Sequence, residues 1–571
     1  MTSAFGSMRI GLIVLCTEAW LASCAEASEP LARPTFHCIG LYWQPPEGAA
    51  DNPCTVRYRP KVAPQWKEAT PLWFDNSQHP GLDALSRQYR GSIVNLLPAV
   101  EYEIVLTVEN TGTRRSLLAT TWSEEFPVRS IVSLDGGTYN STLHITQGGS
   151  ARDGYVVYTP PKGREAVIDV ANQMDCCIQV VASYVILRGL TCKGARRHGI
   201  VLGDVSDVAI ERCDVSGWGR IGSNGFGVNL DSAIYSESRD LERIVVQRCR
   251  LHHPRSNASA WTQGGHPLGP HAIYWKGSRG WHVIRYNEMD SDEEHCLNDI
   301  MGEQRNFSFE GFPNRDTDIY CNRLANCRDD AIESEGANMN VRIWGNSIDS
   351  FYMAIGAATT SLGPQYIWRN LSGFSRRGPV GTDNFYRGGA FLKLGTSDRQ
   401  YTLGRVFVFH NTILQPPAPW TFPKGDFAGC ESGVNITGDR AYQSNVLCRN
   451  NILHVNNYTR GQDSVRDHSG DPSNSYDFDL CNGFVVAGGE QHGIHLKPDE
   501  TPQYDAENAA GQYALAVGAP GYDAAERLPN FNDQFTGEGP DIGACEHGAA
   551  ALPVGVEADW TAWLRQWEQA N

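Results

Sequence analysis

The sequence predicts an all-β protein in which a small β-sandwich precedes a long parallel β-helix. Strand-like runs separated by Pro/Gly-rich turns fill the first part of the chain, and two short strand phrases recur through the rest. With 571 residues, the chain is too long for one ordinary compact domain unless a repeat architecture absorbs the length. The recurring phrases therefore account for most of the chain.

Residues 1–27 have the composition of a secretory signal peptide, with Arg9 before the apolar run 10–16 and small residues up to Ala27. Cys24 closes a segment that resembles a bacterial lipoprotein cleavage box, so a lipid anchor at Cys24 is an alternative. No later apolar run approaches the roughly 18 residues of a membrane span. We therefore expect a secreted, periplasmic or cell-surface protein.

The charge of the chain and its cysteine content limit the kinds of partner and covalent or metal cross-link that are expected. The formal net charge is −17 and the basic residues are not clustered, which argues against nucleic acid as a partner. Export permits disulfides, and Cys38 and Cys54 are spaced as a local pair. The cysteines and histidines lack the spacing of a structural zinc site.

Residues 34–128 predict the sandwich. The strand-like runs are 40–43, 55–58 and 102–108. Leu97-Pro98, four residues before Tyr102, resembles the Leu-Pro-x-x-x-Tyr corner of fibronectin type III domains, in which the tyrosine hydroxyl ties a strand to the preceding loop. The resemblance implies a module that holds or presents a catalytic domain.

Residues 129–548 carry the repeat. A strand phrase ending in Gly, Cys or Asn recurs between residues 185 and 450, with its last residues 24 to 41 apart. This spacing is typical of a parallel β-helix, whose coils of three short strands stack because one coil cannot bury its apolar side. Asparagine ends the later phrases because stacked amides hydrogen-bond between coils and because asparagine tolerates a left-handed turn. We predict these asparagines to be structural.

A second phrase, which includes 271–276, 295–300 and 330–335, places functional side chains on one outer face. Because side chains alternate along a strand, the residue after each core-facing apolar residue points outward. Coils stack about 4.8 Å apart. The alignment therefore puts His271, His295 and Asp330 in one column, and Tyr274, Asn298 and Glu333 in the next.

Four carboxylates crowd into seven residues of the last segment: Asp329, Asp330, Glu333 and Glu335. Taken alone, this crowding favours a solvated charged face. A solvated face does not need small residues, histidines and a tyrosine in register, so the alignment favours a catalytic or ligand-binding cleft instead.

Crowded carboxylates suit glycosidic cleavage, which needs one carboxylic acid and a second, ionised carboxylate. We predict Asp330, Glu333 and Glu335 as the catalytic pair or trio, with Asp329 holding the turn. The predicted substrate-binding residues are His271, Tyr274, Trp275, Lys276, His295, Asn298 and Asp299. Strict alternation would point Asp299 inward, so either the alignment shifts there or this carboxylate is hydrogen-bonded.

Two alternatives stay open, and no cofactor is certain. The carboxylates could hold Ca²⁺ while Lys276 or Tyr274 removes a proton from a uronate, which is β-elimination by a polysaccharide lyase. Four carboxylates repel a polyuronate unless a cation intervenes, so this ranks second to hydrolysis. A non-catalytic glycan-binding or adhesive protein ranks third.

Segments 136–146, 326–346 with 363–370, and 539–548 resemble the opening, core and closing motifs of the pectate-lyase-like right-handed parallel β-helix superfamily. The resemblance covers about 420 residues, 129–548. It implies a right-handed β-helix of a secreted, polysaccharide-degrading type, in a superfamily that includes hydrolases, lyases, epimerases and transferases. Asp329-Asp330 is similar to the acid and base pair of polygalacturonases, whose Gly-His-Gly and Arg-Ile-Lys motifs are absent, which argues against galacturonan as the substrate.

Residues 549–571 close the chain. Their tryptophans, at 560, 563 and 567, form a helical apolar stripe. We predict a helix that caps the exposed end of the β-helix.

Overall fold

The computed structural model describes residues 29–79, 81–258, 268–292, 294–302, 305–375, 389–415, 430–436, 441–456, 462–505 and 513–570. In this part of the chain the regular structure is β-strand apart from two short 3₁₀ turns and the helix α2 (Trp560–Ala570). The predicted all-β class is confirmed. The predicted signal peptide and Cys24 lie outside the described residues. None of the described helices is long and apolar enough to span a membrane.

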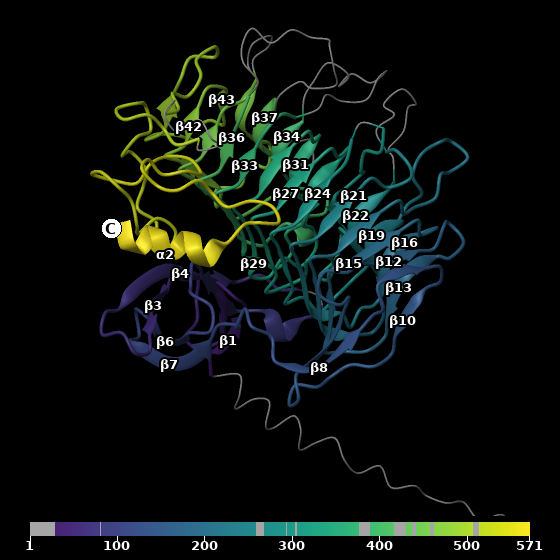
Figure 1. Cartoon of the computed structure of the whole chain (residues 1–571). Helices are drawn as coiled ribbons and strands as arrows, with labels where there is room; N and C mark the ends of the chain where they lie inside the picture. The colour runs from purple at the N-terminus through teal and green to yellow at the C-terminus, as the bar shows by residue number, and fades with distance from the viewer. Residues whose placement is uncertain are drawn as a thin grey trace, which may run out of the picture.

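The N-terminal unit is a seven-stranded antiparallel sheet folded around its own core (Figure 1). In sheet order its strands are β1 (Leu31–Pro34), β2 (Ile39–Trp43), β5 (Gln88–Ile93), β4 (Lys67–Asp75), β3 (Cys54–Pro60), β6 (Glu101–Val108) and β7 (Thr113–Thr120). The backbone N–H of Leu97 donates to the Tyr102 hydroxyl at 2.9 Å. The tyrosine corner expected from the sequence is thus present.

The rest of the chain forms three parallel sheets of 12, 12 and 13 strands. The first sheet runs from β10 (Leu143–Ile145) to β43 (Phe484–Val485), the second from β8 (Val128–Ser133) to β41 (Ser475–Asp477), and the third from β9 (Gly137–Tyr139) to β44 (Ile494–His495). Each strand pairs with the strand three places later in the chain, so each coil adds one strand to each sheet (Figure 1). This is the predicted parallel β-helix.

A continuous core fills the space between the three sheets. In the first sheet, five successive strands place Ile273, Met301, Ile332, Ile355 and Leu392 side by side as an inward column. These strands are β22 (His271–Trp275), β25 (Met301–Gly302), β28 (Asp330–Glu333), β31 (Met353–Ala357) and β34 (Ala390–Leu394). The column fixes which neighbouring residues face outward.

A ladder of asparagine side chains runs along one corner, as predicted, except that its last position is Asn451 and not the predicted Asn450. Each Nδ2 donates to the Oδ1 of the next coil at 2.9–3.0 Å, through Asn287, Asn322, Asn346, Asn370, Asn411 and Asn451. The left-handed residue is the one before each ladder position, such as Gly345 (φ 62°), and not the asparagine itself. The asparagines therefore serve the ladder, and the preceding residue makes the turn.

The second sheet has a covered outer face. Tyr320 of β26 (Asp318–Tyr320), Trp344 of β29 (Val341–Trp344) and Trp368 of β32 (Gln365–Trp368) stack with ring centroids 4.1 and 4.6 Å apart. The sandwich and α2 pack against this face, with Trp560 of α2 6.3 Å from Trp344 (Figure 1). The helix therefore lies along the flank of the β-helix, and the expectation that it caps an end is wrong. Its apolar stripe packs on the outward aromatic row of the second sheet, which the end of the β-helix does not offer.

The expected disulfide between Cys38 and Cys54 does not form, and all cysteines among the described residues are free thiols. Cys38 packs in the cluster between the sandwich and the second sheet, whereas Cys54 packs in the core of the sandwich. Both are fully buried. Close spacing in the sequence thus did not bring the two thiols together.

Candidate functional site

The outward column next to the inward one holds chemically active side chains. Pairing places Tyr274, Gly302, Glu333, Gly356 and Lys393 at equivalent positions on successive strands. Gly302 and Glu333 follow the paired core residues Met301 and Ile332. Side chains at this position share the outer surface of the first sheet.

Three carboxylates meet on this surface. One oxygen each of Asp330, Glu333 and Glu335 lies within 4.8 Å of the others. The ammonium of Lys393 lies 2.6 Å from Asp330 Oδ2 and 3.3 Å from Glu335 Oε1. Asn306 Nδ2 donates to Glu333 Oε1 at 2.8 Å. We call Asp330, Glu333, Glu335 and Lys393 the carboxylate cluster.

Two glycines make room for the cluster. A Cβ on Gly356 would lie 2.0 Å from Asp330 Oδ2, and a Cβ on Gly302 would lie 2.6 Å from Glu333 Oε2. Any larger residue at either position would displace a carboxylate. The sequence predicted open space from the small residues that precede the apolar residue of each phrase, whereas the residues that make room here follow it.

Burial dominates the electrostatics of the cluster. It raises the pKa of Asp330 to about 7, although Lys393 opposes the rise. It also raises the pKa of Glu333 well above its usual value, and the neighbouring carboxylates add to that effect. The pKa of Lys393 is itself held well above its usual value by the surrounding carboxylates, which outweigh its burial. The cluster therefore combines a glutamate that holds its proton more tightly than usual, Glu333, with a lysine ammonium that does the same.

The two coils before the cluster contribute His271, from β22, and Asn298 and Asp299, which precede β25. Asn298 Nδ2 donates to Asp299 Oδ2 at 2.9 Å, and His271 Nδ1 lies 3.5 Å from the same oxygen. The Asp299 carboxylate adds to the rise in the pKa of Glu333. Burial lowers the pKa of His271 to about 4. His271 is therefore neutral, and its ring packs 4.5 Å from the ring of Tyr274.

The predicted register of 295–300 is wrong by four residues. Met301, rather than Leu297, pairs with Ile273 and Ile332, so Asp299 takes the column position expected for His295. His295 instead binds Asp292 at 2.8 Å on the surface. It is not part of the cluster. The shift also resolves the orientation of Asp299, whose carboxylate is hydrogen-bonded.

Trp275 and Lys276 differ from the prediction as well. Trp275 is fully buried in the core against Phe312, because the residue two after Ile273 also points inward. It cannot contact a sugar. Lys276 Nζ pairs with Glu237 at 3.2 Å, two coils before the cluster. Lys276 therefore has no direct contact with Asp330 or Glu335.

Asp329 holds the turn into β28, as expected. Its N–H donates to the Asn298 carbonyl at 3.3 Å, and its own carbonyl accepts from the N–H of Met353 at 3.2 Å. Its charge also raises the pKa of Asp330. Asp329 thus joins three coils and tunes the cluster.

The sequence reasoning missed two contributors, Lys393 and Asn306. Lys393 follows a core leucine in the second phrase, as Glu333 follows Ile332, so the same alternation could have found it. Asn306 comes from an inserted segment between strands, and no periodic signal marks it. That segment is fixed by the sandwich, where His79 packs 5.5 Å from the ring of Phe309.

The donor set of the cluster fits a divalent cation in part. Three carboxylates with oxygens within 4.8 Å could hold Ca²⁺, which prefers oxygen ligands. Lys393, however, already places a positive charge against two of them. A cation at this position would have to displace that ammonium.

No family model matches the chain, and no curated protein and no solved structure is significantly similar to it.

Proposed function

We propose that the protein is an exported carbohydrate-active enzyme, a glycoside hydrolase that cleaves a polysaccharide or oligosaccharide at the carboxylate cluster. The observation that carries the proposal is that Glu333, a carboxyl with a raised pKa, lies beside carboxylates that pair with Lys393, with oxygens of all three carboxyls within 4.8 Å of one another. Glycosidic cleavage needs these two kinds of group together. The resemblance to pectate-lyase-like β-helices of polysaccharide-degrading bacteria supports the same class.

Glu333 fits the general acid. It is the most exposed of the three, at 8 % against 1 % for Asp330 and 2 % for Glu335, and its Oε2 lies over the open position at Gly302. Its proton would pass to the glycosidic oxygen as the bond to the leaving sugar breaks. Asn306 holds the other oxygen and so orients the acid.

Asp330 fits the ionised partner. Its Oδ2 is fixed by Lys393, and its Oδ1 is buried and accepts no hydrogen bond from the described residues. The oxygens lie within 4.8 Å of one another, whereas inverting enzymes separate their carboxyls by about 6.5–9.5 Å to admit water. We therefore assign a retaining mechanism in which Asp330 bonds to the anomeric carbon. Glu333 then deprotonates the water that hydrolyses this ester.

β-Elimination remains the second candidate, supported by the partial fit to Ca²⁺. Lys393 weighs against it, because its ammonium pairs with Asp330 and Glu335, two of the carboxylates that Ca²⁺ would need as ligands. A non-catalytic glycan-binding role is the third candidate.

The test is a panel of purified glycans incubated with the full chain. New reducing ends without ultraviolet absorbance support hydrolysis, whereas unsaturated, absorbing products that require Ca²⁺ would identify a lyase. Binding without any product would identify an adhesive protein.

On the glycan that is cleaved, Glu333→Gln and Asp330→Asn should each lower kcat by about 10²–10⁴-fold with unchanged thermal unfolding. Glu288→Gln, on the third sheet, is the matched control and should keep full activity. Full turnover by both site variants would refute the assignment.

A further inference from the structure

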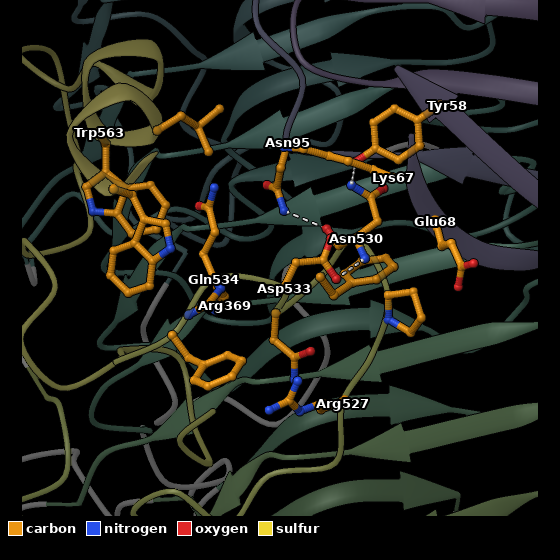
Figure 2. Close-up of a pocket in the computed structure, with 16 residues that line it drawn as sticks. Tyr58, Lys67, Glu68, Asn95, Arg369, Arg527, Asn530, Asp533, Gln534 and Trp563 are labelled. Carbon is orange, nitrogen blue, oxygen red and sulfur yellow. Dashed lines mark hydrogen bonds between the residues drawn. The ribbon is translucent and has the colours of Figure 1, made fainter. Parts of the chain in front are cut away.

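A cavity lies between the sandwich, the loop 527–535 and α2, apart from the carboxylate cluster (Figure 2). Its volume of 510 Å³ falls within the range of small-molecule sites, about 300–1,000 Å³. Arg369, which follows β32, forms part of its lining, and none of the lining residues belongs to the first sheet. Whatever binds here does not compete directly for the cluster.

Aromatic and polar groups face each other across this cavity. Trp563 and Trp567 line one side, with ring centroids 5.3 Å apart and the rings 17° from parallel. Asn95 and Asp533 line the other side (Figure 2). A sugar ring has an apolar C–H face and a rim of hydroxyls, so a wall of each kind suits it.

The lining of the cavity also includes a mostly buried cation, the guanidinium of Arg369. Arg369 is only 5 % exposed, and its one hydrogen bond to a described residue goes from Nη1 to the Ala544 carbonyl at 2.7 Å. Glu546 and Asp541 influence its pKa only through space. A buried guanidinium normally pairs with a carboxylate or phosphate, because its desolvation is otherwise uncompensated.

Two further observations support a ligand at this position. Asn95 Oδ1 is buried and accepts no hydrogen bond from the described residues, although Nδ2 donates to the Asn530 carbonyl. The guanidinium carbon of Arg527, which also lines the cavity, lies 4.6 Å from the centroid of the Phe535 ring. The lining has three cationic and two acidic residues, a positive balance in a chain of net charge −17.

We propose that this cavity binds a carboxylated sugar, a uronic acid unit of a glycan. The tryptophan wall would take the face of the sugar ring, Arg369 and Arg527 would take its carboxylate, and Asn95 would accept a hydroxyl hydrogen. The site is a binding site and not a second catalytic centre. It does not depend on the reaction at the cluster.

The test uses the full chain carrying Glu333→Gln, so that no turnover intervenes. Trigalacturonate is titrated by calorimetry and by tryptophan fluorescence, and neutral galactotriose is the matched ligand. Trigalacturonate should bind at least tenfold more tightly than galactotriose and should change the fluorescence. Raising the salt concentration should weaken its binding, because the attraction is partly ionic.

Arg369→Gln and Arg527→Ala should each weaken trigalacturonate binding about tenfold. Arg565→Ala is the matched control, because Arg565 is exposed on α2 and does not line the cavity. Arg527 is exposed, so its variant keeps the test valid if Arg369→Gln does not fold. Equal affinity for both trisaccharides, unchanged binding by both variants, or no binding at millimolar ligand would overturn the proposal.

The outcome is separate from that of the proposed hydrolase. If the Glu333→Gln chain binds trigalacturonate while the unmodified chain cleaves no glycan, only the proposed hydrolase activity is refuted. Binding that disappears with Asp330→Asn added would place the ligand at the cluster and overturn the second site.

Discussion

The outer faces of the first and second sheets differ although one backbone repeat builds both. The second sheet presents a stacked row of Tyr320, Trp344 and Trp368, which the sandwich and α2 cover. The first sheet presents glycines and carboxylates at the corresponding outward positions. Large outward side chains thus create adhesion between units, whereas small ones leave room for titratable groups. The repeat fixes the scaffold, and the outward residues decide its use.

The two faces are also connected. The sandwich that covers the second sheet contacts the segment 305–312, which delivers Asn306 to Glu333. Thr359 and Ser361 hold the same segment through hydrogen bonds to its carbonyls. The covering module therefore helps to shape the site.

The largest expected effect is on the covered face. Trp344→Ala should lower the free energy of unfolding by about 3–5 kcal/mol, because it removes a fully buried ring from the middle of the stack. Denaturant unfolding monitored by circular dichroism measures this change. Trp66→Ala, at a partly exposed tryptophan of the sandwich, should cost less than about 1 kcal/mol. Equal effects of both substitutions would remove the energetic contrast between covered and open surfaces.

A smaller effect is expected on the open face. Gly356→Ala should lower kcat about 10–100-fold, because its Cβ would displace the Asp330 carboxylate from Lys393. The free energy of unfolding should fall as well, because the displaced Asp330 carboxylate is buried and loses its ion pair with Lys393. Gly203→Ala, on the same sheet, is the control because its nearest atom would lie at an ordinary 3.4 Å. Steady-state kinetics on the identified glycan would show the difference, and unchanged kcat in Gly356→Ala would contradict it.

The subtlest expected effect is a shift in pH dependence. Asp330 acts ionised, so kcat/KM should rise with pH through an apparent pKa of about 7. Lys393→Met removes the cation that lowers this pKa, so the acidic limb should move to higher pH by about one unit or more. Lys276→Met should leave the profile unchanged. A limb that stays in place or moves to lower pH would show that Lys393 does not tune Asp330.

The sequence predicted the features that the repeat enforces. The asparagine ladder and the outward positions of Glu333 and Tyr274 follow from stacking and alternation. The predictions that were wrong concern positions where insertions interrupt the repeat. In the coil of His295, a strand of only two residues leaves too little pattern to fix the register.

Contacts between distant units were beyond the reach of periodicity. The amphipathic stripe of α2 predicted burial but not the surface that buries it, because an aromatic row and a helix end look equally apolar in sequence. The positioning of Asn306 depends on packing with the sandwich, more than 200 residues earlier in the chain, at His79. No local pattern encodes such a contact.

The asparagine ladder carries a consequence for how such a chain can lengthen. Every amide points its donor the same way, and the last, Asn451, ends on the carboxylate of Asp479 at 2.8 Å. A carboxylate accepts but does not pass the bond on, so the direction of the ladder ends there. Duplication of a whole coil within the ladder copies one donor and one acceptor and leaves both ends intact. Loss of a ladder position would strand an amide, so insertions can lengthen the loops of a coil, but the number of coils in the ladder changes only in complete turns.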